Sequence, residues 1–192
     1  MNINLIVFHF INNLAGKNGN IDGLLIFSSK YLTYIMFAAV CYIFLLGIIK
    51  HHKTYRYGAI HTFLLMAIGL GINALLGLVA YIPRPFINHH VHLLYPHIPD
   101  SSFPSDHATV SMSMAAGLRW INKPIGWIFM VLSIWVGFSR IYVGHHYPVD
   151  IIGSYGIVWA VYFLYRKFFE ARIISILEIV EQWGLKHIIR KS

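Results

Sequence analysis

The chain has 192 residues, of which 57% are hydrophobic and only 11% are charged, and its mean hydropathy is +0.62. Soluble domains carry about 25% charged residues, so this composition excludes an ordinary soluble protein and indicates an integral membrane protein. The formal net charge of +8 does not indicate nucleic-acid binding, because the basic residues gather at the ends of apolar segments.

Apolar stretches of near-spanning length predict an all-α, polytopic membrane helical bundle that forms one domain over residues 1–192. We expect about five spanning helices, at residues 24–49, 58–82, 107–121, 125–142 and 149–168. The third stretch is the shortest, and its outer end carries His107. Because burying an ionisable group against lipid is costly, we expect this end to be recessed in the bundle and to line a cavity.

The two chain ends have a different pattern from the spans. Residues 2–14 hold an apolar run that is too short to cross about 30 Å of hydrocarbon. Residues 171–189 place apolar side chains on one helical face and polar side chains on the other. Both ends are therefore predicted to be amphipathic helices that lie in the membrane interface.

The distribution of basic residues predicts the orientation. With the five spans taken in order, 11 of the 15 basic residues fall on the side reached by the ends of the first, third and fifth spans. By the positive-inside rule this side is cytoplasmic. Arg84 and Arg140 fall on the opposite side, where we expect an anion to bind.

Two short motifs are predicted to meet at that outer side. Arg84 lies between two prolines, which makes a stiff, extended stretch after the second span. Ser105 is placed to cap the third span, so that the free backbone amides near Asp106 and His107 point outward at the positive end of a helix dipole. Each motif alone is also compatible with a plain helix boundary, but together they favour a phosphate site.

A third motif, SRIYVGHHYPVD at residues 139–150, carries the chemistry. His146 and Asp150 are four residues apart, a spacing that brings imidazole and carboxylate together if Pro148 begins a helix. A carboxylate that holds the Nδ1 proton would leave Nε2 free to attack an electrophile. His145 is the competing histidine, but only His146 has the four-residue spacing. Arg140 supplies a cation beside this pair.

These residues resemble the signature motifs of the type 2 phosphatidic acid phosphatase superfamily. The resemblance covers residues 58–168, and PRPF, FPSDHA and GFSRIYVGHHYPVDIIGS are most similar to its bacitracin-resistance branch, which are bacterial undecaprenyl pyrophosphate phosphatases. The chain departs from the family pattern at two positions. Gly77 stands where the first motif has a lysine, so that cation is replaced by a histidine, a backbone amide or nothing. Asp106 replaces a glycine, and it is expected to point away, pair with an arginine, or accept a hydrogen bond from a protonated substrate oxygen.

The resemblance implies a mechanism without a metal or other cofactor. His146 is the expected nucleophile that forms a phosphohistidine, Asp150 fixes its tautomer, and His107 protonates the leaving lipid phosphate and then activates water. The expected phosphate-binding residues are Arg84, Ser105, Asp106 and Arg140. The implied partners are a polyprenyl diphosphate and membrane lipids, and the implied location is the bacterial cytoplasmic membrane, with the site on the outer face.

Several alternatives stay open at this point. The loop at residues 86–103 holds four histidines, which favour a substrate-facing loop over a plain connector or a zinc site, since no cysteine or clear carboxylate set completes a metal site. A phosphatase for another lipid phosphate, such as phosphatidylglycerol phosphate or phosphatidic acid, is a close alternative function. A histidine-rich metal transporter would need acidic residues within the spans, and the only one is Asp150 at a span end.

Overall fold

A computed structural model describes the backbone of residues 3–189 and the side chains of residues 3–183. Every regular element in these residues is helical, which confirms the all-α prediction. In chain order the elements are α1 (Ile3–Asn12), α2 (Gly19–Phe27), the π-helical turn η1 (Ser28–Leu32), α3 (Thr33–Ile49), α4 (Lys53–Val79), α5 (Pro85–Asn88), α6 (Asp106–Leu118), α7 (Lys123–Tyr142), α8 (Pro148–Phe168) and α9 (Glu170–Ile189).

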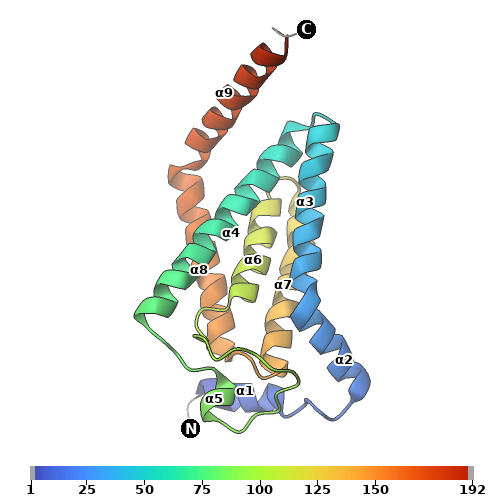
Figure 1. Cartoon of the computed structure of the whole chain (residues 1–192), viewed down its shortest axis with the longest axis vertical. Coiled ribbons are helices and arrows are strands. Elements are labelled where there is room, and N and C mark those ends of the chain that lie inside the picture. Colours follow the sequence, from blue (N-terminus) through green and yellow to red (C-terminus); the bar gives the residue numbers. More distant parts are fainter. Residues whose placement is uncertain (1–2, 190–192) are drawn as a thin grey trace.

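Four segments of the described chain are long and apolar enough to cross a membrane. These are Gly19–Ile49, which joins α2, η1 and α3, and the helices α4, α7 and α8. The third predicted span corresponds to α6, which has 13 residues and is too short to cross hydrocarbon by itself. Figure 1 shows α6 in the middle of the bundle, surrounded by the longer helices.

The sequence of α6 explains its central position. Its side chains from Ala108 to Leu118 are almost all buried, and small residues dominate. Small residues let helix backbones approach closely. At Gly117 a Cβ atom would lie 2.7 Å from the Cα of Thr62 on α4, so only glycine permits this contact. The larger side chains of α6, such as Met112 and Met114, fill the apolar core between α4, α7 and α8.

The helix α1 closes one end of the bundle. Figure 1 shows it lying across the lower end, beneath α7 and α8. Phe8 and Asn12 are buried, while Ile3, Ile6 and Phe10 are exposed. The Asn12 side chain donates to the carbonyls of His92 (2.9 Å) and Tyr142 (2.8 Å) and accepts from the His92 amide (2.8 Å). The amphipathic N-terminal helix is thus also a structural part of the bundle, because it ties the 86–103 loop to α7.

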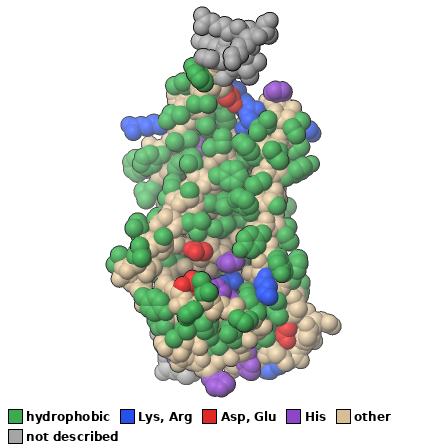
Figure 2. All heavy atoms as spheres, in the orientation of Figure 1, with side chains coloured by type: hydrophobic (Ala, Val, Ile, Leu, Met, Phe, Trp, Pro, Cys, Tyr) green, Lys and Arg blue, Asp and Glu red, His purple; other side chains and the backbone are tan. Residues whose placement is uncertain are grey.

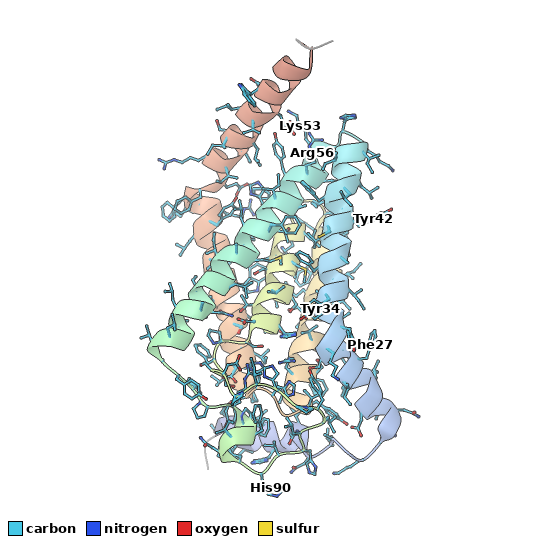
Figure 3. All side chains as sticks on the ribbon, in the orientation of Figure 1. Phe27, Tyr34, Tyr42, Lys53, Arg56 and His90 are labelled. Atoms are coloured by element: carbon cyan, nitrogen blue, oxygen red, sulfur yellow. The ribbon has the colours of Figure 1, made fainter. Side chains whose placement is uncertain are left out.

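The helix α9 leaves α8 after Phe169 and projects past the other end of the bundle (Figure 1). It is held to the start of α4, where Arg56 donates from Nε to Glu181 (3.0 Å) and Lys53 lies near the same carboxylate. Figure 3 labels both basic residues at this end of α4. In Figure 1, α1 lies across the end of the bundle, whereas α9 runs closer to the direction of the long helices. The position in the membrane interface predicted for the C-terminal helix therefore stays a prediction.

Candidate active site

The turn between α7 and α8 brings the third motif together. Gly144 has φ of +89°, a left-handed conformation that ends α7 and that glycine adopts without strain. The amide of His145 then donates back to the carbonyl of Arg140 over 3.0 Å. Pro148 occupies the first turn of α8, where its missing N–H costs nothing. These local rules place His146 beside the end of α7 that carries Arg140.

Both ring nitrogens of His146 have a partner, and these partners define its tautomer. Nδ1 lies 2.9 Å from the carbonyl oxygen of Ser102, which only accepts hydrogen bonds, so Nδ1 carries the proton. Nε2 lies 3.0 Å from Nη1 of Arg84, which only donates. The residue is 1% exposed. Nε2 therefore presents an unprotonated lone pair, as a nucleophile requires.

The role expected of Asp150 is met only indirectly. Its Oδ2 lies 3.5 Å from Nδ1 of His146, beyond good hydrogen-bond distance, and accepts instead from the Ser102 hydroxyl and from the Tyr147 amide (2.8 Å). The prediction that the carboxylate holds the Nδ1 proton itself therefore differs from the geometry. The carboxylate fixes Ser102, and the Ser102 carbonyl orients the imidazole. Ser102 was missed by the sequence motifs because its working group is a backbone carbonyl.

Arg84 lies over His146, the expected nucleophile, and is itself held by an acidic side chain. Its Nη1 donates to His146 and to the carbonyl of His145 (3.1 Å), and its Nε donates to Asp100 over 2.6 Å. Arg84 is 5% exposed, whereas half of the Asp100 side chain is exposed. Asp100 is the only acid in the 86–103 loop, a signal that was available in the sequence.

Arg140 is the second cation of the site, and part of it is unpartnered. Its Nη1 donates to the Tyr95 hydroxyl (3.0 Å) and to Oγ of Ser29 (3.2 Å). Its Nε and Nη2 are buried with no partner among the described residues. Buried donors without acceptors are costly, and a guanidinium fork matches phosphate oxygens. Arg140 is thus arranged to take an anion.

The start of α6 contributes further donors. The Ser105 hydroxyl is fully buried, and it has no hydrogen-bond partner among the described residues. The Ser105 amide donates to Oγ of Ser154 (2.8 Å), and Ser154 donates to the carbonyl of Asp150 (2.7 Å), which ties the start of α6 to α8. The expected side-chain cap by Ser105 is not formed. Its hydroxyl is therefore available to a ligand.

Asp106 has a definite partner away from the arginines. Its Oδ1 accepts a hydrogen bond from Nδ2 of Asn73 on α4 over 2.8 Å, and its side chain is exposed. Asn73 also donates to Oγ1 of Thr109 (3.0 Å). Of the three possibilities considered for Asp106, this geometry favours the one that points away. Its assignment to the phosphate site stays a prediction that the geometry does not favour.

An apolar groove leads away from the polar residues. A cavity of about 460 Å³ between α3, α4 and α6 is lined by His107 and Asp106 at one end and by Phe37, Leu70 and Val110 along its length. Figure 3 labels Tyr34 near the lower end of α3, and its ring lies 6.4 Å from the ring of His107. Figure 2 shows histidine, acidic and basic side chains gathered low on the visible face, below a largely apolar surface. His107 thus lies where the polar site meets the groove.

Burial controls the histidine ionisation at this site. Burial, with the nearby charges of Arg140 and Arg84, lowers the pKa of His146 well below its usual range. Burial and the charge of Arg140 lower the pKa of His145 to about 2. Both rings are therefore neutral near pH 7, and a neutral imidazole is the form that the expected nucleophilic role of His146 requires.

The remaining histidines of the 86–103 loop do not assemble a metal site in the described residues. His97 packs against the ring of His145 at 4.6 Å and lies 3.8 Å from Asp100. His89 packs against Tyr147. These contacts place the loop against the site, which favours the substrate-facing interpretation.

A second cavity, which has a polar lining, lies at the opposite end of the bundle. It has a volume of about 430 Å³, and its lining includes Arg119, Lys123, Arg166 and Glu170. Glu170 accepts a hydrogen bond from Nε of Arg166 over 3.1 Å, which offsets one of the positive charges. The three sequence motifs contribute no residue to it, so the candidate active site is the one at the other end.

Comparison with known proteins shows the family of the chain. A model of the PAP2 superfamily matches residues 58–174, which include every motif residue. The chain belongs to the PAP2 superfamily. It is 37% identical over 166 residues to the undecaprenyl-diphosphatase BcrC of Bacillus subtilis, which covers 86% of this chain and 84% of the relative. This PAP2 protein is therefore a membrane-embedded phosphatase.

Two other similarities extend the comparison. The bacitracin transport permease protein BcrC of Bacillus licheniformis is 28% identical over 186 residues, covering 94% of this chain and 90% of that protein. The crystal structure of LpxE from Aquifex aeolicus superposes with a TM-score of 0.74 at 24% identity, over 88% of this chain and 97% of that one. The second similarity concerns the fold alone, and it confirms the arrangement of helices in this PAP2 protein.

Proposed function

We propose that this PAP2 protein hydrolyses undecaprenyl diphosphate to undecaprenyl phosphate and inorganic phosphate through a phosphohistidine on His146. One observation carries the proposal: a buried imidazole with its Nδ1 proton held by Ser102 presents Nε2 to a cationic site that opens, past His107, into an apolar groove. The groove fits a hydrocarbon chain, and the two arginines fit phosphate.

In the first step Nε2 of His146 attacks the terminal phosphorus. A P–N bond forms while the bond from phosphorus to the bridging oxygen breaks, and His107 delivers a proton to the leaving lipid phosphate. Arg84 releases Nε2 as it turns its N–H groups to the phosphoryl oxygens. Arg140 offers its unpartnered Nε and Nη2, and Ser105 its free hydroxyl, to the same oxygens.

In the second step water breaks the P–N bond. His107, now neutral, accepts a proton from water as the oxygen attacks phosphorus, and His146 leaves as a neutral imidazole with its original tautomer. Inorganic phosphate is released and the protons balance over the cycle. Each step uses only side chains of this chain.

The undecaprenyl substrate is proposed from the relatives, because a groove fits any long hydrocarbon chain. The relative that is 37% identical is an undecaprenyl-diphosphatase, and another carries a bacitracin-related name. The site end of the bundle faces away from the basic ends of α3, α4, α7 and α8, so the positive-inside rule favours an outer-face site. On that face of the bacterial cytoplasmic membrane the reaction recycles a lipid carrier for cell-wall synthesis and reduces the target of bacitracin.

The test is a comparison of substrates with the purified full chain in EDTA. Phosphate release from a polyprenyl diphosphate is expected to exceed release from phosphatidic acid or phosphatidylglycerol phosphate by at least about tenfold in kcat/KM. The reverse order would replace this proposal with the alternative of a diacyl lipid phosphate. Loss of activity in EDTA would contradict the metal-independent mechanism.

A further inference from the structure

We infer that Lys30, together with Ser29 and Tyr95, forms a second phosphate subsite that holds the lipid-linked phosphate of a diphosphate substrate. The inference deepens the proposed function and rests on it. It concerns residues outside the three sequence motifs: Ser29 and Lys30 lie in η1, and Tyr95 lies in the 86–103 loop.

The subsite begins at the π-helical turn η1. A π-helical turn inside an α-helical span re-aims the side chains around it and is frequent at functional sites. Here the turn directs Ser28 and Ser29 to different partners: Ser28 accepts from Trp135 Nε1 on α7 over 2.9 Å, and Ser29 shares a hydrogen bond with the Tyr95 hydroxyl over 2.7 Å. The next residue, Lys30, places its Nζ 4.5 Å from the centroid of the Tyr95 ring.

This group is joined directly to Arg140. Nη1 of Arg140 donates both to the Tyr95 hydroxyl and to Oγ of Ser29. Lys30 is therefore one aromatic ring away from the arginine that is expected to hold the terminal phosphate. A ring face attracts an ammonium group but accepts no conventional hydrogen bond, so the three N–H donors of Lys30 are not satisfied by Tyr95.

Lys30 also lies about one helical turn before residues that line the apolar groove. Tyr34, which lines the groove and packs against His107, follows Lys30 by four residues, about one helical turn. If the hydrocarbon chain occupies the groove and the terminal phosphate lies at Arg140, the second phosphate must lie between them. Lys30 is the basic residue between these two positions, and its side chain is half-buried.

Charge supplies the physical reason for a lysine here. Cleavage leaves negative charge on the lipid-linked phosphate, and Arg84 and Arg140 are occupied by the phosphoryl group that moves to His146. An ammonium group beside the leaving phosphate stabilises that charge. A lipid monophosphate has no such second phosphate, so Lys30 would favour diphosphates over monophosphates. Lys30 would also supply a cation in a chain that has Gly77 in place of the motif lysine.

The experiment measures the selectivity of Lys30→Met, which keeps much of the apolar stem and removes the charge. The readout is the ratio of kcat/KM for a polyprenyl diphosphate to that for the monophosphate of the same chain length. We expect this ratio to fall about 10- to 100-fold relative to the unmodified protein and to recover partly in Lys30→Arg. Lys17→Met, which removes an exposed lysine near the same end of the bundle, is the matched control and is expected to keep the original ratio.

A second readout uses inorganic pyrophosphate and orthophosphate as inhibitors, so that it does not depend on the lipid tail. Pyrophosphate is expected to inhibit the unmodified protein more strongly than orthophosphate, and Lys30→Met should lose this difference. An unchanged substrate ratio in a Lys30→Met protein of normal thermal stability would overturn the subsite. If the unmodified protein does not hydrolyse the polyprenyl diphosphate, the proposed function itself fails; hydrolysis with an unchanged ratio in Lys30→Met overturns the subsite alone, and the two failures are thereby distinguished.

Discussion

Arg84 donates a hydrogen bond from Nη1 to Nε2 of His146 over 3.0 Å, so the lone pair of the proposed nucleophile is covered by a residue expected to bind the substrate. The same arginine is held at Nε by Asp100. An incoming phosphate must draw the guanidinium away from the imidazole before phosphorus reaches Nε2. Phosphate binding and exposure of the nucleophile are therefore coupled through one side chain.

The Asp100 carboxylate competes with phosphate for Arg84. Replacing it with asparagine keeps a hydrogen-bond acceptor but removes the charge, so Asp100→Asn should tighten inhibition by orthovanadate about two- to fivefold, as expected for a half-exposed ion pair. Glu178→Gln, at the far end of the bundle, serves as the control. Weaker inhibition in Asp100→Asn would show that the acid positions Arg84 and does not compete for it.

Arg140 uses the planar fork of its guanidinium group. Nη1 is occupied by Tyr95 and Ser29, which leaves Nε and Nη2 for phosphate. Lysine restores the charge but not the fork, so Arg140→Lys should lower kcat/KM about 100-fold, whereas Arg172→Lys on exposed α9 should not. Retention of more than about a third of the activity would indicate that Arg140 acts only as a point charge.

Ser102 and Asp150 act as one unit in this geometry. The Asp150 carboxylate accepts a hydrogen bond from the Ser102 hydroxyl, and the Ser102 carbonyl accepts one from Nδ1 of His146. Ser102→Ala and Asp150→Asn should each lower kcat about 10- to 100-fold. The double variant should have a kcat no lower than that of the less active single variant. Additive losses in kcat would instead support a direct contact between carboxylate and imidazole during turnover.

The sequence was most informative where chemistry and local geometry coincide. The turn at Gly144 and Pro148, and the apolar helices, follow from local conformational rules, so the spacing of Arg140, His146 and Asp150 was interpretable in advance. The same spacing predicted a direct contact between His146 and Asp150, and this part was wrong in detail. The backbone carbonyl of Ser102 takes the position next to the imidazole instead. No residue pattern encodes that choice.

The contacts of the site that could not be predicted join residues far apart in the chain. Tyr95 and Ser29 meet Arg140 from loops and helices that are 45 and 111 residues away in the chain. Their approach depends on how α2, η1 and the 86–103 loop pack against α7. Asn73 was a visible signal, as an amide in an otherwise apolar stretch of α4, but its partner Asp106 emerged only from the packing of α4 on α6.

Histidine burial predicts a loss of stability in acid. Burial lowers the pKa of His145 to about 2 and holds the pKa of His146 well below its ordinary value of 6.5, so the unfolded state binds more protons than the native state below pH 6.5. The free energy of unfolding should therefore fall as pH decreases, by up to about 1.4 kcal/mol per pH unit for each residue. Thermal midpoints in detergent from pH 7 to pH 5 test this.

A histidine variant isolates the cause of that pH dependence. His145→Gln should show a shallower fall in thermal midpoint than the unmodified protein, because the protonation difference that His145 contributes is gone. His90→Gln, which alters an exposed residue of the same loop region, should keep the original slope. Parallel curves for all three proteins would mean that other groups produce the acid sensitivity.

The rate of phosphate release by His146→Ala tests the central claim most directly. The substitution removes the attacking Nε2 while the surrounding helices remain, so a protein with a near-normal thermal midpoint should release phosphate from polyprenyl diphosphate at least about 1,000-fold more slowly. A folded His146→Ala protein that kept a tenth or more of the original rate would contradict covalent catalysis by His146.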